Sequence, residues 1–219
     1  LLLLKSLFLV LNYKLIKRIL DFVFSFLLII FLIPLFLIIG ILIKIDSNGS
    51  IFYVQKRIRN NKNTFSCYKF RTMHSESKYL LKKMFIKNTN FKNEFAETRK
   101  IINDPRITNV GKFLRFTSLD EIPQILNILL GHMHLVGPRA EWVKLSDRYD
   151  KKITSYVARH VVKPGITGWA QISYPYGVDD FDAEQKLMYD MYYIKNWTIW
   201  LEIEVCFKTL LVILDKKGF

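Results

Sequence analysis

Residues 22–43 read FVFSFLLIIFLIPLFLIIGILI, an apolar stretch of 22 residues without a charged side chain. A straight helix of this length would reach about 33 Å, enough to cross the hydrocarbon core of a bilayer. Pro34 lies near the middle, where its missing N–H group and its ring favour a kink or a break. The stretch therefore predicts a membrane-embedded helix that is interrupted, in preference to one ordinary transmembrane span.

Basic residues flank this stretch on both sides. They are Lys5, Lys14, Lys17 and Arg18 before it, and Lys44, Lys56, Arg57, Arg59 and Lys62 after it. Because cytoplasmic flanks carry the excess of Lys and Arg, a single span should show that excess on one side only. We therefore predict a re-entrant helix hairpin over residues 17–45, with both ends cytoplasmic. Asp21 is expected to pair with Lys17 and Arg18 at the membrane edge.

The composition combines apolar and cationic character. The chain has 219 residues, is 51% hydrophobic and carries a formal charge of +14, so it is too apolar for a disordered basic tail. The cationic excess indicates an anionic partner, which composition alone leaves open between nucleic acid, an acidic membrane and phosphorylated substrates. Cys67 and Cys206 lack any paired spacing, which argues against a disulfide framework and against a cysteine zinc site.

The remaining chain predicts an α+β fold that is mostly helical. Alternating polar and apolar residues predict a β-hairpin over residues 50–73, with a turn at Asn60 and Asn61. Residues 76–92 predict a basic amphipathic helix, which suits either solvent or an anionic lipid surface. The other expected elements are helices at 112–131 and 182–194, and Gly/Pro-rich loops at 134–143 and 161–177.

Three domains follow from this pattern. Residues 1–16 are interpreted as the remnant of an N-terminal membrane region or as a short interfacial helix, and residues 17–45 as the re-entrant helix. Residues 46–219 are expected to form a membrane-associated catalytic domain. The stretch 196–214 is apolar, but Glu202 and Lys208 argue against a second span.

The candidate chemistry lies in SLDEIP, residues 118–123. The spacing S-x-x-E is typical of a capping box, in which Asp120 and Glu121 would serve only to begin a helix. Pro123 would then lie past the first turn, where proline is unfavourable. The alternative is a helix that begins later and leaves both carboxylates at its mouth, where they suit a phosphoryl group or a metal.

Four cations are candidates for binding a diphosphate near these acids, because guanidinium and ammonium groups match phosphate oxygens. They are Lys69, Arg71, Arg115 and Arg139. The four histidines form no recognised set of metal ligands, and we interpret His132 and His134 as structural or solvent-facing. The sequence contains no glycine-rich nucleotide fingerprint.

Several motifs occur in a fixed order along most of the chain. They are KRILDF (17–22), YKFRTM (68–73), DPRITNVGKFLRFTSLDEIPQ (104–124), HLVGPRAE (134–141), VKPGITGWAQI (162–172) and YDMYYIKNW (189–197). Together they closely resemble the bacterial sugar transferase family, the monotopic polyprenyl-phosphate phosphoglycosyl transferases. The resemblance implies transfer of a sugar 1-phosphate from a UDP-sugar to undecaprenyl phosphate, with release of UMP, at the cytoplasmic face of the inner membrane. Such a reaction begins exopolysaccharide or O-antigen assembly.

The resemblance also implies roles for individual residues. Asp120 would be the nucleophile that forms a covalent phosphosugar–aspartyl intermediate, and Glu121, with Asp120, would hold Mg²⁺. Lys69, Arg115 and Arg139 match the family's anion-binding positions. The implied partners are the UDP-sugar, undecaprenyl phosphate and membrane lipids, with no nucleic acid. The identity of the sugar and a homo-oligomeric state are left open.

The chain departs from the family pattern at five positions. Ile33 replaces a small residue before the helix proline, Arg59 replaces a hairpin glycine, and His132, His134 and Ala140 alter the segment GHMHLVGPRA. Arg59 lies in the predicted hairpin turn and Ala140 lies beside Arg139, so these changes bear on the geometry of the turn and on the positioning of that arginine. Two other hypotheses remain: a membrane-anchored basic binding module without catalysis, and an inactive scaffold homologue.

Overall fold

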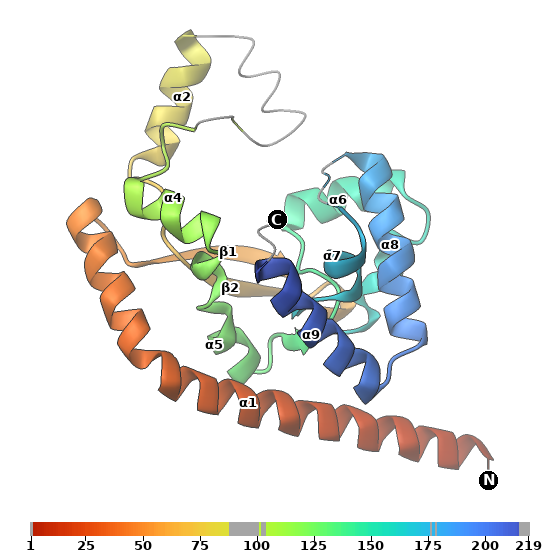
Figure 1. The fold of residues 1–219 in the computed structure, drawn as a ribbon. Coiled ribbons are helices and arrows are strands. Elements are labelled where there is room, and N and C mark those ends of the chain that lie inside the picture. Colours follow the sequence, from red (N-terminus) through yellow and green to blue (C-terminus); the bar gives the residue numbers. More distant parts are fainter. Residues whose placement is uncertain (1, 88–100, 102–103, 176, 178, 215–219) are drawn as a thin grey trace.

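The longest element of the computed structural model is helix α1 (Leu2–Asp46), which runs along one side of the molecule and curves upward around it (Figure 1). The structure describes residues 2–87, 101, 104–175, 177 and 179–214. Pro34 lies inside α1 without ending it, so the expected break is replaced by one continuous, curved helix. A proline removes a single backbone donor, and the hydrogen bonds of neighbouring turns can carry the helix past it.

Among the described helices, the segment Tyr13–Asp46 of α1 is long and apolar enough to cross a membrane. Most of this segment is exposed. The re-entrant path of the helix stays a prediction. Residues 2–16 continue directly into the apolar segment as part of α1, without a boundary between them.

The predicted hairpin is confirmed. Strands β1 (Phe52–Ile58) and β2 (Thr64–Phe70) pair antiparallel, and the short 3-10 turn η1 (Asn60–Lys62) joins them. Left-handed backbone, expected at Asn60 and Asn61, occurs at Asn61 and Lys62, with φ of 54° and 58°. Arg59, in place of the family's glycine, needs no positive φ because it precedes this left-handed pair.

The pairing register decides which side chains of β2 face the site. Phe52 lies opposite Phe70, and the two rings stack 5.5 Å apart. Because side chains alternate along a strand, Phe65, Cys67 and Lys69 share the other face. Phe65 and Cys67 are buried in the core with Ile128 of α5, and Lys69, on the same face of the strand, lines the cavity of the candidate site.

The predicted single helix over 112–131 is wrong. The segment forms α4 (Asn109–Phe116), the 3-10 turn η2 (Leu119–Glu121) and α5 (Gln124–Leu129). Ser118 takes a left-handed conformation with φ of 56° and its side chain makes no capping hydrogen bond, so the capping box is also wrong. The alternative of a later helix start, with Pro123 at the N-cap of α5, is confirmed.

The C-terminal half consists mainly of helices, which lie to the right of α5 in Figure 1. They are α6 (Val143–Lys152), the 3-10 helix η3 (Tyr156–Val161), α7 (Trp169–Ser173), α8 (Asp180–Lys195) and α9 (Ile199–Leu214). The predicted helix over 182–194 is confirmed within α8, which begins with a capping box at Asp179. Of the predicted helix over 76–92, α2 (Ser77–Lys87) is present, and 88–92 lie outside the described residues.

Two stretches that the sequence predicts as loops also contain regular structure. Strands β3 (His134–Val136) and β4 (Gly165–Thr167) pair in parallel, and the pairing extends as a single bridge from Arg139 to Gly165. A Cβ on Gly165 would lie 2.1 Å from the backbone nitrogen of Gly137, so only glycine permits this approach. Glycine and proline signal turns in a sequence, but they do not reveal which two backbones meet.

Polar side chains anchor α1 to the rest of the molecule. The expected pairing of Asp21 with Lys17 and Arg18 is wrong. Asp21 instead pairs with His134 Nδ1 at 2.5 Å, and buried Lys17 pairs with Glu202 of α9. Arg18 donates to two carbonyls at the end of α5, at 2.6 and 2.7 Å. Lys17, Arg18 and Asp21 bind to the protein because a charge turned toward lipid is costly. His134, as the partner of Asp21, has a structural role.

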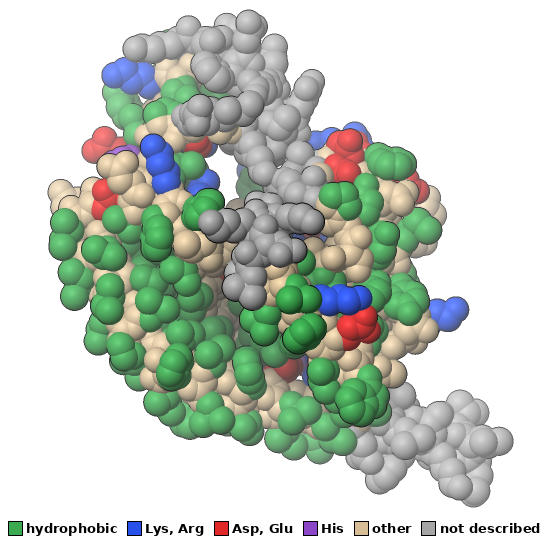
Figure 2. All heavy atoms as spheres, viewed as in Figure 1, with side chains coloured by type: hydrophobic (Ala, Val, Ile, Leu, Met, Phe, Trp, Pro, Cys, Tyr) green, Lys and Arg blue, Asp and Glu red, His purple; other side chains and the backbone are tan. Residues whose placement is uncertain are grey.

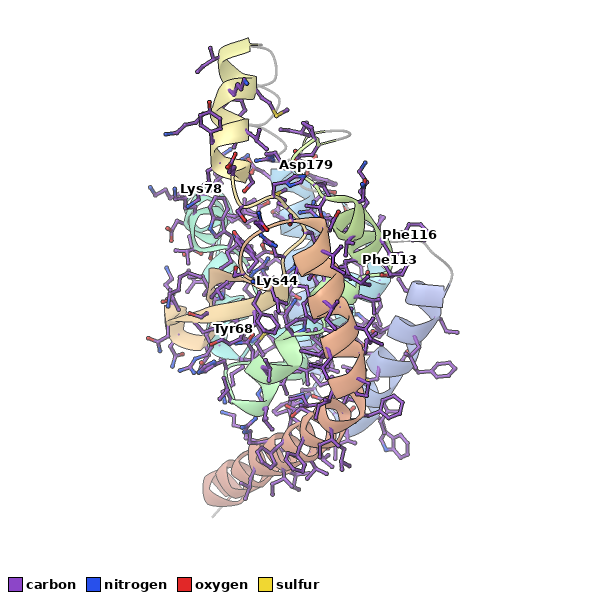
Figure 3. All side chains as sticks on the ribbon, turned by 90° about the vertical axis from the view of Figure 1, so that its left-hand side faces the viewer. Lys44, Tyr68, Lys78, Phe113, Phe116 and Asp179 are labelled. Carbon is purple, nitrogen blue, oxygen red and sulfur yellow. The ribbon has the colours of Figure 1, made fainter. Side chains whose placement is uncertain are left out.

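The outer surfaces of α1 and α9 are strongly apolar, as the hydrophobic side chains in Figure 2 show. On α9, Trp200 is 79% exposed. Trp197, which precedes α9, is partly buried and donates to Glu202 at 2.5 Å. On α4, Phe113 and Phe116 point away from the body of the protein and are also exposed (Figure 3). Exposed apolar surface of this extent marks an interaction site.

Candidate active site

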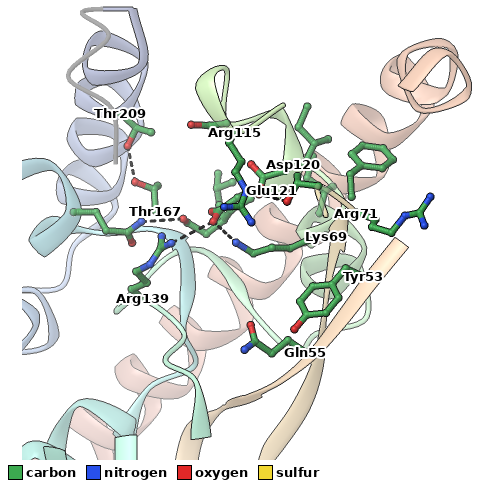
Figure 4. Close-up of a pocket in the computed structure, with 18 of the residues that line it drawn as sticks. Tyr53, Gln55, Lys69, Arg71, Arg115, Asp120, Glu121, Arg139, Thr167 and Thr209 are labelled. Carbon is green, nitrogen blue, oxygen red and sulfur yellow. Dashed lines mark hydrogen bonds and ion pairs between the residues drawn. The ribbon is translucent and has the colours of Figure 1, made fainter. Parts of the chain in front are cut away.

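Asp120 and Glu121 lie on η2, at the wall of a cavity of about 1650 Å³ (Figure 4). The turn is held in place by α5, whose fully buried Asn127 donates to Ser66 O at 2.7 Å and accepts from Tyr68 N at 3.0 Å. These two bonds attach α5 to β2. The four cations selected from the sequence all line the same cavity.

Glu121 joins two of these cations. Its Oε1 accepts from Lys69 Nζ and from Arg139 Nη2, the latter at 3.2 Å. Burial alone would raise the pKa of Glu121, but Arg139 and Lys69 hold it far below its usual range. Glu121 is therefore a permanent anion between two cations that come from β2 and from the end of β3.

Asp120, its neighbour, lies in the opposite electrostatic setting. Burial raises the pKa of Asp120, and Lys69 and Arg115 reduce this effect without reversing it. Its carboxylate has no ion pair with any described side chain. Adjacent acids with opposite pKa shifts are typical of catalytic sites, where the two perform different tasks.

Arg115 and Arg71 differ in what their guanidinium groups contact. Arg115 lines the cavity and donates from Nε to Thr72 Oγ1 at 2.9 Å. Arg71 points away from the dyad (Figure 4) and donates to Ser47 O and Ser75 Oγ, both at 2.6 Å. Arg71 thus stabilises the loop after α1, and a contact of its own with substrate stays a prediction.

The cavity also contains residues that the sequence analysis missed. Arg106 lines it and forms a buried ion pair with Asp104 at 2.5 Å. Thr167 and Gln171 line it beside Arg139, and Thr167 hydrogen-bonds Thr209 of α9 at 2.7 Å. The Asp104–Arg106 pair could have been found from the sequence, because the two residues are separated only by Pro105. No sequence signal links Thr167 to Thr209.

The end of the cavity between α1 and α9 is lined mostly by apolar side chains, together with Lys17, Asp21 and Glu202. Its lining includes Leu20 and Phe24 from α1, and Ile203, Phe207 and Leu210 from α9. One end of the cavity thus suits phosphate oxygens and the other end suits a hydrocarbon.

Mg²⁺ fits the polar end only in part. No group of three or more His, Cys, Asp and Glu side chains converges on a metal position in the described part of the chain. Mg²⁺ is however commonly held by one or two carboxylates together with substrate phosphates and water. Asp120 and Glu121 match this pattern, in which a diphosphate completes the coordination.

The site combines an acid pair and surrounding cations with an exposed apolar helix. This combination defines a class of protein that binds a phosphorylated ligand beside an apolar surface. The sequence comparisons give this class a family. The model of the bacterial sugar transferase family matches residues 12–216. The chain belongs to the bacterial sugar transferase family.

Individual relatives agree with this assignment. The UDP-N-acetylgalactosamine-undecaprenyl-phosphate N-acetylgalactosaminephosphotransferase of Aeromonas hydrophila is 38% identical over 206 residues, which are 94% of this chain and 45% of that protein. The exopolysaccharide production protein ExoY of Sinorhizobium fredii is 39% identical over 202 residues, covering 92% and 87%. The UDP-glucose:undecaprenyl-phosphate glucose-1-phosphate transferase of Escherichia coli is 37% identical over 208 residues, covering 94% and 40%. The chain thus spans less than half the length of the first and third of these relatives.

The opposite settings of the two acids predict opposite effects of matched substitutions at pH 7. Glu121→Gln should lower the free energy of unfolding by about 1–2 kcal/mol, because it leaves Lys69 and Arg139 without their shared anion. Asp120→Asn should leave stability unchanged or raise it, because burial disfavours the Asp120 charge. Thermal unfolding of both variants in the same detergent measures the difference.

The sign of the pH dependence follows from the two shifts. The pKa of Glu121 is depressed, so its contribution is present above its ordinary value of 4.5 and is lost as the pH falls below that value. The pKa of Asp120 is raised from 3.8, so its contribution is present at acid pH and is lost as the pH rises. The Glu121→Gln defect should therefore shrink below about pH 4.5, and a defect of equal size at acid and neutral pH would contradict the assignment.

Proposed function

We propose that this protein transfers a sugar 1-phosphate from a UDP-sugar to undecaprenyl phosphate, through a covalent intermediate on Asp120. The observation that carries the proposal is the pair of adjacent carboxylates in opposite settings at the cationic end of a cavity whose other end is apolar. The activities for which the Aeromonas and E. coli relatives are named, both those of undecaprenyl-phosphate transferases, support it.

In the first step, an oxygen of Asp120 attacks the phosphorus that carries the sugar. The bond from this phosphorus to the bridging oxygen of the diphosphate breaks, and UMP leaves with the electron pair of that bond. Asp120 suits the role of nucleophile because its carboxylate is free of ion pairs with described side chains. Glu121, by contrast, is engaged by Lys69 and Arg139.

In the second step, a phosphate oxygen of the lipid attacks the same phosphorus, and the carboxylate of Asp120 leaves. The product is undecaprenyl-diphospho-sugar, and the enzyme returns to its starting state. Dividing the reaction in this way avoids direct attack of one anionic substrate on another. Lys69, Arg115 and Arg139 stabilise the negative charge on the phosphoryl oxygens in both steps.

The acceptor is assigned to the apolar end of the cavity. A polyprenyl phosphate needs cations for its head and a hydrocarbon surface for its tail, and the two ends of the cavity offer both. The walls formed by α1 and α9 continue into the exposed apolar surfaces of the same helices, from which a lipid could enter sideways.

Mg²⁺ is proposed as the cofactor, held by Asp120 and Glu121 together with the diphosphate. When bound, it neutralises charge on the diphosphate. The protein side chains position the substrate and supply the nucleophile.

We place the protein at the cytoplasmic face of the inner membrane, with α1 entering and leaving one leaflet. The curvature of α1, its apolar outer surface and the basic residues on both flanks support this topology. Lys17, Arg18 and Asp21, which are bound to the protein body, would mark the depth at which α1 leaves the lipid.

The two other hypotheses make different demands on the site. A basic binding module has no use for the free Asp120 carboxylate at the cationic end of the cavity. The scaffold hypothesis rested on changes around Arg139, but His134 binds Asp21 and Ala140 lies in the core, so both changes have packing roles. RNA binding without turnover of any UDP-sugar would favour the first alternative, and binding of UDP-sugar without turnover the second.

The nucleophile assignment predicts the loss of one activity and the appearance of one adduct. Asp120→Asn should reduce UMP release from UDP-sugars by more than about 10³-fold, because an amide cannot form the acyl phosphate. Intact-protein mass spectrometry of the unsubstituted enzyme without lipid acceptor should detect a bound sugar phosphate. Asp147→Asn, at an exposed acid of α6, is the matched control. Full activity of Asp120→Asn across glucose, galactose and N-acetylhexosamine donors would remove the assignment.

The acceptor site predicts a selective defect. Phe207→Ser should raise KM for undecaprenyl phosphate several-fold, because it removes apolar wall from the cavity, and should leave formation of the adduct unchanged. Phe116→Ser is the matched control, since Phe116 is an exposed phenylalanine of α4 that does not line the cavity. Equal defects in the two variants would show that only general membrane contact was lost.

The re-entrant topology predicts that both ends of α1 are cytoplasmic. Single cysteines at Lys5 and Asn60, in a variant without Cys67 and Cys206, should resist a membrane-impermeant thiol reagent in intact cells and react after lysis. Labelling of one end alone in intact cells would show that α1 crosses the membrane.

A further inference from the structure

Arg139 belongs to a five-residue segment, 137–141, whose backbone is bound by other elements at every residue. The first two residues hydrogen-bond the backbone of β4, at 2.9 Å in both cases. The carbonyls of the last two residues accept from Arg57 and from the backbone nitrogen of Ile58, both on β1. The central carbonyl, that of Arg139, accepts from Nη2 of Arg159 at 3.1 Å.

Arg159 is an unusual residue to support a loop, because it is 95% buried, with 5% of its surface exposed. It forms an ion pair with Asp190 of α8 at 2.7 Å and lies 3.8 Å from Glu141. It also donates to the hydroxyl of Tyr156. Burial raises the pKa of Asp190 to about 6, and the guanidinium of Arg159 opposes this shift.

Such a pair is poorly explained by stability alone. Hydrophobic side chains of similar volume often stabilise a core as well as a buried ion pair does, or better. What Arg159 supplies that a hydrophobic residue does not is a rigid donor with a fixed direction, here aimed at the backbone of Arg139.

We propose that Arg159, oriented by Asp190, is a positioning residue that holds the guanidinium of Arg139 against Glu121. This role rests on the proposed function, in which Arg139 binds the diphosphate. The chain of contacts runs from α8 through η3 to the segment 137–141 and ends at Glu121. Each link is a charged group or a hydrogen bond with a defined direction, so a shift at one end is transmitted to the other.

A double-substitution cycle tests the proposal. Arg159→Lys keeps the charge opposite Asp190 but loses the planar fork that also reaches Arg139. It should lower kcat/KM for the UDP-sugar by about 10-fold to 100-fold, because small displacements of a positioned group have effects of this size. In an Arg139→Met background the same substitution should cost less than about 3-fold, because the group it positions is absent.

Equal losses in the two backgrounds, or no loss in the first, would overturn the proposal, since a general structural role does not depend on Arg139. Arg148→Met is the matched control. Arg148 of α6 pairs with Asp180 of α8 at 2.7 Å. It therefore also joins a helix to α8, but at the surface and without a contact to Arg139 in the described residues. Its kcat/KM should match that of the unsubstituted enzyme.

Two further measurements keep the outcome decisive. If Arg159→Lys does not fold, Tyr156→Phe removes one hydrogen bond of Arg159 and should give a smaller loss that also disappears with Arg139→Met. The Kd for UDP, measured by calorimetry, repeats the cycle without turnover. Coupling in the Kd without UMP release would support the positioning role and contradict the proposed function. UMP release without coupling would do the reverse.

Discussion

The carboxylate of Glu121 is the interaction on which the geometry of the site depends. Lys69 and Arg139 come from segments that are distant in sequence, and both carry positive charge into one cavity. Like charges that converge in a partly buried site repel one another. Because Glu121 lies between them, the cations can converge before any substrate arrives. Its neighbour Asp120 then remains the acid without a fixed partner among the described side chains.

The same principle explains how α1 joins the body of the protein. A helix with a lipid-compatible surface has no hydrophobic reason to prefer protein over membrane. Lys17, Arg18 and Asp21 supply a different reason, because each finds a partner on the protein and none would find one in lipid. The three residues occupy one short section of α1, so they fix both its position along the axis and its rotation.

Much of this arrangement was predictable from sequence, and the exceptions have physical causes. The hairpin, the late start of α5 and the convergence of Lys69, Arg115 and Arg139 with the dyad all follow from local patterns or motif resemblance. The left-handed Ser118, which separates α4 from η2, does not, because serine rarely takes that conformation.

The partners of buried charges were the least predictable feature. Lys17 was expected to pair with Asp21, one helical turn away, and pairs instead with Glu202, 185 residues later. Asp21 pairs with His134, which sequence reasoning marked as a departure from the family and as structural or solvent-facing, without a partner. Local spacing shows which charges need partners, whereas only the fold shows which partners are within reach.

These long separations have a consequence for synthesis on the ribosome. α1 is made before these partners, which follow Asp21 and Lys17 by 113 and 185 residues. During that interval the nascent helix carries unpaired charges beside its apolar segment, and such charges are stable only where water or lipid headgroups can solvate them. Until β3 and α9 have been translated, Asp21 and Lys17 therefore lack the partners that fix α1 to the body of the protein.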